Sequence, residues 1–201
     1  MHSVISLLLL LLTTGVIAIP FDFLFHSPGT LSGGQSILSN INEWRTAYGV
    51  AKLSWNNTLA SNAQKTGRDN GGLNEKHELN HGTSSRKCPK SAETNPAAGS
   101  MAQVISPGIQ DQDICGRNMD RMTPFGLIHM GWLCEVATDP QLKGGCSAVL
   151  EAAHLYVTPG ETGHHDILTN TKYSKIGCAF SRHPAALKCV TFTGLWVCDL
   201  A

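Results

Sequence analysis

The chain has 201 residues, with fifteen basic and fifteen acidic side chains and no formal net charge when its histidines are neutral. A neutral surface gives no electrostatic reason to expect nucleic acid or an anionic membrane as a partner. The length corresponds to one domain that can bury a sizeable core.

The N-terminus carries the one long apolar run of the sequence. Leucine fills positions 7–12, and Val16 and Ala18 stand just before Ile19. This pattern predicts a secretory signal over residues 1–18, cleaved after Ala18, because the run is too short to span a bilayer. We therefore expect a secreted, extracellular protein without an integral membrane segment.

Proline and glycine mark the stretch that follows the signal. Residues 19–36 are predicted to form an N-terminal arm, ahead of a single domain over residues 37–201. Ser36 can cap a first helix that ends at Gly49. The apolar positions of this helix lie at helical spacing: Ile37, Ile41, Trp44 and Tyr48.

A second helix is predicted to start at Asn57 or Thr58 and to end before Gly67. Residues 68–124 are rich in Gly, Asn, Ser and Pro, which favours long loops with short elements. Two further helices are predicted, over residues 125–137 and 148–156.

The last forty or so residues favour β-structure. Four strands are predicted there, over residues 167–170, 176–180, 190–193 and 195–198. Helices followed by strands indicate an α+β fold with a small antiparallel sheet.

Seven cysteines fit an oxidising compartment: Cys88, Cys115, Cys134, Cys146, Cys178, Cys189 and Cys198. They are expected to form disulfides rather than zinc sites, because no two are spaced as CxxC. The odd count leaves one thiol free or intermolecular. The sequence Asn56-Asn57-Thr58 is a glycosylation sequon, so Asn56 is expected at the surface with a glycan.

Residues 77–81 read His-Glu-Leu-Asn-His and match HExxH, in which two histidines bind zinc and the glutamate is the general base of a peptidase. Glycines immediately before and after leave about two helical turns, too few to fix both ligands firmly. A solvated polar loop is therefore our interpretation for His77 and Glu78. A secreted zinc metallopeptidase acting through His77, Glu78 and His81 is kept as an alternative.

Six short segments of the sequence occur in an order that is typical of one protein family. They are INEWR (41–45), LSW with LASNA (53–63), LNHG (79–82), WLCE (132–135), GHHDILTNTKYSKIGCAF (163–180) and WVCDL (196–200). Together they resemble the CAP superfamily of secreted proteins, also called the SCP domain. It includes cysteine-rich secretory proteins, venom antigen 5 and plant pathogenesis-related type-1 proteins. The resemblance runs from about residue 37 to the C-terminus.

The chain also departs from the family pattern. The family's GHYTQ is GHHDI here, so His165 and Ile167 replace Tyr and Gln, and the family's strand tryptophan is Asn170. The family's GEN motif, which supplies a cavity glutamate, is missing, and Gln103 in MAQV stands in that region. The sequence is therefore that of a divergent member.

The resemblance implies an α-β-α sandwich, with a three-stranded sheet between helix layers and disulfides that stabilise it. It also implies a non-enzymatic binding module. The expected partner is a sterol or fatty acid, or a host or cell-surface protein. An effector that acts only through protein–protein interaction is the alternative.

For the binding site, the resemblance implies a metal set of His81, Glu135 and His164, with zinc as the candidate ion. Gln103 would hydrogen-bond a water bound at this site. The alternative to a metal site is a polar cluster held together by hydrogen bonds alone. His165 is expected on the other face of a strand, exposed to solvent.

Apolar residues between positions 97 and 125 can line a lipid pocket or pack the core under a loop. They are Met101, Val104, Ile105, Ile109, Met119, Met122 and Phe125. Gln103, Ile105 and Met122 are the ligand-binding candidates. The family pattern and strand order imply disulfides Cys178–Cys198 and Cys88–Cys189. For the third bridge, Cys134–Cys146 is preferred to a pairing with Cys115.

Overall fold

The computed structural model describes residues 33–71, 99–108, 124–142, 144–147, 150, 161–183 and 193–201. Several predicted features lie outside these ranges: the signal, the HExxH motif with His81, the helix predicted over 148–156 apart from residue 150, Cys88, Cys115, Met122 and Cys189.

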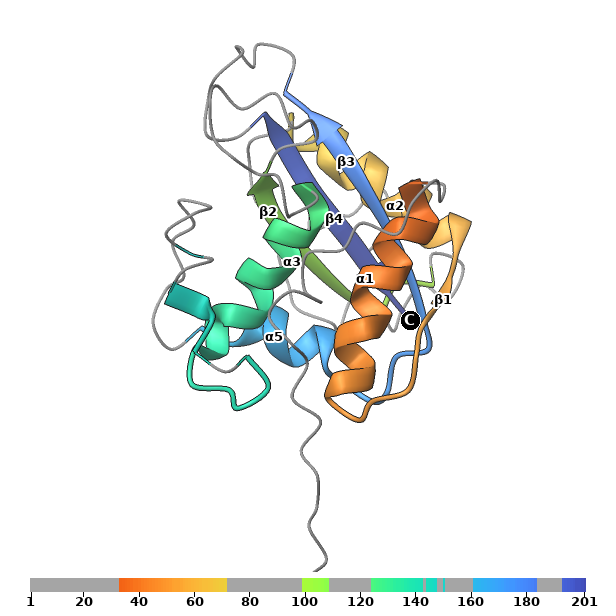
Figure 1. The fold of residues 1–201 in the computed structure, drawn as a ribbon. Helices are drawn as coiled ribbons and strands as arrows, with labels where there is room; N and C mark the ends of the chain where they lie inside the picture. The colour runs from red at the N-terminus through yellow and green to blue at the C-terminus, as the bar shows by residue number, and fades with distance from the viewer. Residues whose placement is uncertain are drawn as a thin grey trace, which may run out of the picture.

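The fold is an α-β-α sandwich of the α+β class, as predicted (Figure 1). Its described elements are α1 (Gly33–Ala47), β1 (Ser54–Trp55), α2 (Asn57–Asp69), β2 (Ala102–Gly108), α3 (Pro124–Leu133), the 3-10 turn η3 (Cys134–Val136), α5 (Gly163–Leu168), β3 (Lys175–Arg182) and β4 (Gly194–Leu200). The sheet has four strands in the order β1-β3-β4-β2. β4 is antiparallel to both neighbours, whereas the short β1 runs parallel to β3. The sheet is therefore mixed and four-stranded, and not the antiparallel, three-stranded sheet that was expected.

Both faces of the sheet are covered by helices. Side chains alternate along each strand, so successive residues pack against different helices. On one face Leu195 and Val197 of β4 pack with Ile105 and with Ala63 of α2. On the other face the alternate residues of β4 join the main core with α1 and α3. Figure 1 shows α1 and α3 in front of the sheet and α2 behind it.

Helix α2 packs closely against β3 at Gly177. Its N-cap is Asn56, whose side-chain oxygen accepts from the backbone N–H groups of Thr58 and Leu59. A Cβ on Gly177 would lie 2.1 Å from the backbone nitrogen of Ala60, so no larger residue fits there. Gly67 does not end the helix as predicted. It lies within α2, where a Cβ would meet Ser181 Oγ at 2.3 Å, so close packing explains this glycine.

Three further element predictions differ from the structure. Helix α1 begins at Gly33, so Ser36 lies inside it and is not its cap. Residues 167–170, predicted as a strand, form the end of α5 and the turn after it. Strand β2 forms inside a region predicted as loop, because it pairs with β4 along its whole length. That pairing is a long-range contact that local propensity does not encode.

Two disulfides occur among the described residues. Cys178–Cys198 joins directly paired positions of β3 and β4, and both residues are buried in the main core. Cys134–Cys146 closes the loop that follows α3. Both pairings are those expected from the sequence. Cys88–Cys189 lies outside the described residues.

A polar network is buried between α2 and the sheet. The carboxylate of Asp199 accepts from Gln103 Nε2 at 2.6 Å and from Ser100 Oγ at 2.7 Å. Gln103 Nε2 also lies 3.3 Å from Thr66 Oγ1, and Asn62 Nδ2 lies 3.4 Å from Ser100 Oγ. Burial raises the pKa of Asp199 to about 7, although both hydrogen bonds oppose that rise.

His129 is buried on the other side of the sheet. Its Nδ1 lies 2.7 Å from Asn40 Oδ1, and its ring stacks on Phe125 with centroids 5.8 Å apart. Because an amide oxygen only accepts, Nδ1 carries the proton of the neutral ring. Burial lowers the pKa of His129 to about 3.

These two groups predict opposing pH dependences of stability. Asp199 has a raised pKa, so its contribution to stability is fully present below pH 3.8 and is lost as the pH rises through about 7. His129 has a lowered pKa, so its contribution is present above pH 6.5 and is lost as the pH falls towards 3. Between about pH 4 and 6.5 the two slopes offset each other.

Asp199→Asn removes only the first slope, because an amide can accept from Gln103 and donate to Ser100. We expect the free energy of unfolding of the variant, minus that of the parent, to rise with pH between 4 and 7, by at most about 1.4 kcal/mol per pH unit. Urea unfolding at several pH values measures it. A difference that stays constant with pH would contradict the prediction.

Candidate functional site

The N-terminus of α5 is capped by a carboxylate from another part of the chain. Glu135 Oε2 accepts from the backbone N–H of His164 at 2.8 Å and of His165 at 3.2 Å. Its Oε1 pairs with Nδ1 of the His164 ring. The first N–H groups of a helix lack partners within it, and a negative charge is favourable at that end. Glu135 therefore fixes both the helix and the ring of its first histidine.

The His164 ring lies over β2 and against an aromatic side chain. It stacks on Trp132 with centroids 5.7 Å apart and planes 26° apart. Trp132 is itself held by a 2.8 Å hydrogen bond from its indole N–H to Ser106 Oγ. Nε2 of His164 lies 3.5 Å from the backbone nitrogen of Ile105, which is a long contact. The edge of the ring that carries Nε2 is therefore only weakly engaged.

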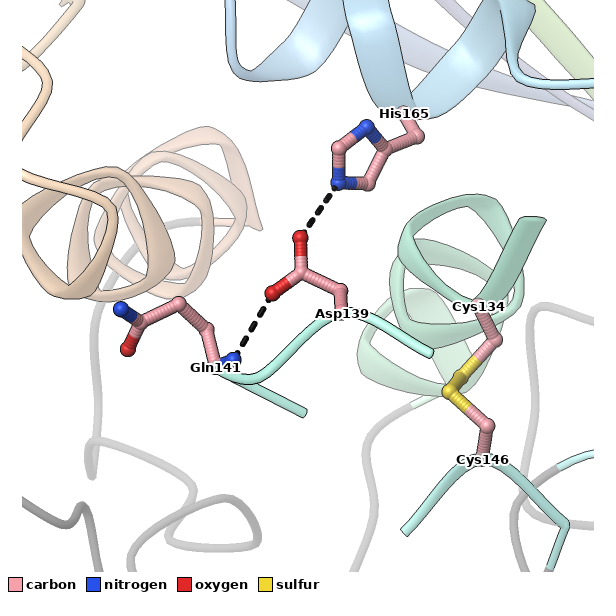
Figure 2. The surroundings of a disulfide bond; sticks show 5 residues. All are labelled: Cys134, Asp139, Gln141, Cys146 and His165. Carbon is pink, nitrogen blue, oxygen red and sulfur yellow. Dashed lines mark hydrogen bonds and ion pairs between the residues drawn. A yellow bond between two sulfur atoms is a disulfide. The ribbon is translucent and has the colours of Figure 1, made fainter. Parts of the chain in front are cut away.

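The next residue makes a second pair of the same kind (Figure 2). Nε2 of His165 lies 3.1 Å from Asp139 Oδ2, and Asp139 Oδ1 accepts from the backbone N–H of Gln141 at 2.7 Å. His165 was expected on a strand and exposed to solvent. That was wrong, because residues 163–168 form a helix and the His165 side chain is only 12% exposed.

Tyr48, in the turn just after α1, closes this second pair from the other side. Its ring meets the His165 ring edge to face, with centroids 5.7 Å apart. Burial, with a further contribution from the charge of Asp139, raises the pKa of the Tyr48 phenol. The side chains of His165 and Asp139 are 12% and 11% exposed, so their interaction is stronger than it would be in water.

The C-terminus of α5 is held by a buried guanidinium. Arg45 of α1 donates through Nη1 to the carbonyl of Leu168 at 2.6 Å and through both Nη atoms to that of Asn170 at 3.1 Å. Its Nε donates to the carbonyl of Ala51. A positive charge at this end complements the helix dipole. Arg45 is 1% exposed, and it joins α1 to the segment that carries the site.

Two of the expected ligand-binding residues lie elsewhere. Gln103 points to the α2 face of the sheet, where Asp199 and Thr66 engage its amide, so it does not join Glu135 and His164. Ile105 is 1% exposed and packs with core residues on the same face. The reason is strand alternation, because odd-numbered residues of β2 face away from α5.

The expected lipid lining is mostly core in its described part. Val104 and Phe125 belong to the main core, as the packing alternative requires. Met101 is 40% exposed, and among the described residues it is the large apolar side chain that lies at the surface. The remaining three, Ile109, Met119 and Met122, lie outside the described residues.

A zinc ion fits the described residues poorly. Among them, no three His, Cys, Asp or Glu side chains converge on one point. Both oxygens of Glu135 are already engaged by His164 and His165. In the His164–Glu135 pair, Nδ1 of His164 is engaged by Glu135, so Nε2 is the nitrogen that could bind a metal. Glu135 would then orient the ring through Nδ1. His81, the other expected ligand, lies outside the described residues.

Residues 38–200 match the CAP family, described as the cysteine-rich secretory protein family. The chain belongs to this family. No curated protein matches the chain at a significant level. The solved structure of BmVAL-1 is similar with a TM-score of 0.47 and 13% identity, over 88% of this chain and 81% of that chain. No helix among the described residues is long and apolar enough to cross a membrane.

Part of this site was predicted from the sequence. Glu135, His164 and Trp132 were assigned through the family motifs, and the structure brings these three together. Asp139 was missed, because it lies in a loop without a motif. Tyr48 was noted only as a core position, and its contact with His165 depends on how α1 packs.

Glu135→Ala should destabilise the fold, because it leaves two backbone donors and the His164 ring without their acceptor. We expect a loss of about 2–4 kcal/mol. This is less than the sum of three hydrogen bonds to a charged acceptor, at roughly 1.5–3 kcal/mol each, because water can partly replace the lost acceptor at this partly exposed site. Glu135→Gln should lose less, because one oxygen remains to accept. Urea unfolding measures both variants.

Glu161→Gln is the matched control, because Glu161 is exposed just before α5 and makes only a long-range charge contribution. Its loss should stay below about 1 kcal/mol. Equal losses for Glu135→Ala and Glu161→Gln would show that Glu135 acts only through its charge.

Proposed function

We propose that this CAP protein is a secreted, non-enzymatic binding module whose ligand contacts Nε2 of His164. The observation that carries the proposal is a polar group that is both accessible and held in place. The His164 side chain is 23% exposed, whereas its partner Glu135 is 9% exposed. Fixed polar groups in an apolar setting are typical of sites that orient a small ligand.

The hydrogen bonds around His164 suggest the head group of the ligand. An ionised Glu135 only accepts, so Nδ1 of His164 is the donor and Nε2 is the acceptor of the neutral ring. A hydroxyl can donate to Nε2 in competition with the long contact to the Ile105 N–H. A carboxylate has no proton to donate, and it would be repelled by Glu135. A sterol hydroxyl therefore fits this site better than the head group of a fatty acid.

Secretion is part of the proposal. The cysteine-rich secretory family, the two disulfides and the apolar run at positions 7–12 all agree with an oxidising destination.

Sterol binding tests the function directly. Radiolabelled cholesterol should bind saturably to the purified secreted protein, and palmitate should bind at least tenfold more weakly, because it lacks the hydroxyl donor. His164→Phe should weaken cholesterol binding, on the order of tenfold for the loss of one hydrogen bond of about 1.4 kcal/mol.

Lys65→Gln is the control, because Lys65 is exposed on α2, across the sheet from α3 and His164, and its surface ion pair with Asp69 contributes little to stability. Absence of saturable binding of either lipid would favour the alternative, an effector that acts through protein–protein interaction. Cleavage of unfolded protein that a chelator abolishes and His77→Ala removes would contradict the non-enzymatic proposal and restore the peptidase alternative.

The glycan on Asn56 can be separated from the capping role of the same side chain. Secreted from a eukaryotic host, the parent should carry one N-glycan, and Thr58→Ala should remove it without changing the cap, because Asn56 Oδ1 accepts from backbone groups only. Asn56→Asp should behave in the same way, and Asn56→Ala should also lose about 1 kcal/mol of stability. Glycosidase digestion and urea unfolding measure the two effects. A parent without a glycan would contradict the prediction.

A further inference from the structure

Two histidine–carboxylate pairs lie side by side at the first turn of α5. The histidines are consecutive, His164 and His165, and their partners Glu135 and Asp139 are four positions apart. Both partners lie in the segment that the disulfide Cys134–Cys146 closes. Figure 2 shows Asp139 and this disulfide. The same short segment therefore binds the first turn of α5 at two neighbouring points.

Asp139 is itself a fixed point. Its backbone N–H donates to the carbonyl of Val136 at 2.9 Å, and its own carbonyl accepts from the N–H of Leu142 at 3.0 Å. Its side chain is 11% exposed and also accepts from the N–H of Gln141. Asp139 can therefore hold His165 without moving, and Tyr48 blocks the other side of the ring.

The position of His164 depends on this anchor through the backbone. The N–H groups of His164 and His165 share one acceptor, Glu135 Oε2, so a rotation of the turn disturbs both hydrogen bonds. The stacking on Trp132 and the 3.5 Å contact to the Ile105 nitrogen need the ring in one orientation. A displacement of this turn would therefore move Nε2 of His164 relative to a bound ligand.

We propose that His165 and Asp139 are positioning residues: their pair locks the first turn of α5 and so holds the His164 ring in place for a ligand. The relevance to a ligand rests on the proposed function, whereas the locking itself does not. In this role His165 does not contact the ligand. Its hydrogen bond to Asp139 holds the first turn of α5 at a second point, beside the one held by Glu135.

The stacking of His164 on Trp132 gives a readout that needs no ligand. In protein labelled with 5-fluorotryptophan, the ¹⁹F resonance of Trp132, assigned with Trp132→Phe, should respond to the position of the imidazole. His164→Ala defines the change on complete loss of the stack. Asp139→Asn and His165→Leu should each produce a large part of that change, and His165→Gln, whose amide can still donate to Asp139, should produce little.

Two controls separate positioning from general destabilisation. Asp166→Asn removes the other carboxylate near His165, which is 64% exposed and 3.3 Å from Nδ1, and should leave the resonance unchanged. Asn56→Ala weakens the fold at the cap of α2 and should also leave it unchanged. An unshifted Trp132 resonance in Asp139→Asn and His165→Leu would overturn the proposal. Equal shifts in the two controls would overturn it as well.

Cholesterol binding of the same variants tests the link to function. We expect Asp139→Asn and His165→Leu to weaken it at least fivefold and His165→Gln to weaken it less. If the parent does not bind cholesterol, the proposed ligand is wrong, and the ¹⁹F shifts alone decide whether the lock exists. Shifted resonances with unchanged cholesterol affinity would overturn the positioning role.

Discussion

The site depends on a helix that cannot be stable by itself. Helix α5 has six residues, well below the length at which an isolated helix persists in water. It is held by side chains from outside, with Glu135 at its N-terminus and Arg45 at its C-terminus. Each charge lies at the end of the helix dipole that it stabilises. The orientation of His164 follows from that support.

The two buried carboxyl groups on opposite sides of the sheet have different roles because they have different neighbours. Glu135 meets a histidine ring and backbone donors, so it is suited to remain an acceptor. Asp199 meets a neutral amide and a hydroxyl in a fully buried position, and burial raises its pKa to about 7, so the protonated form persists up to neutral pH. The first group organises a partly exposed site, and the second belongs to the packing of α2 on the sheet.

The disulfide Cys134–Cys146 orders the loop that carries both carboxylates of the candidate site. It closes a loop of about a dozen residues, which in the chain-entropy model contributes about 3 kcal/mol. Glu135 and Asp139 both lie within that loop, so the carboxylates that hold α5 are ordered by a bond that forms in oxidising surroundings. The same covalent link therefore serves stability and the geometry of the candidate site.

The sequence by itself determined the family, the α+β class and the central pair of the site. The reason is that these depend on residue types at fixed spacing, as in WLCE for Glu135 and GHH for His164. Strand β2, the helical state of residues 163–168 and the roles of Gln103 and His165 were decided only by tertiary structure. Long-range pairing sets which face a strand residue presents, and the packing of α1 and the disulfide loop sets which acid meets which histidine. Local propensity carries no information on such contacts.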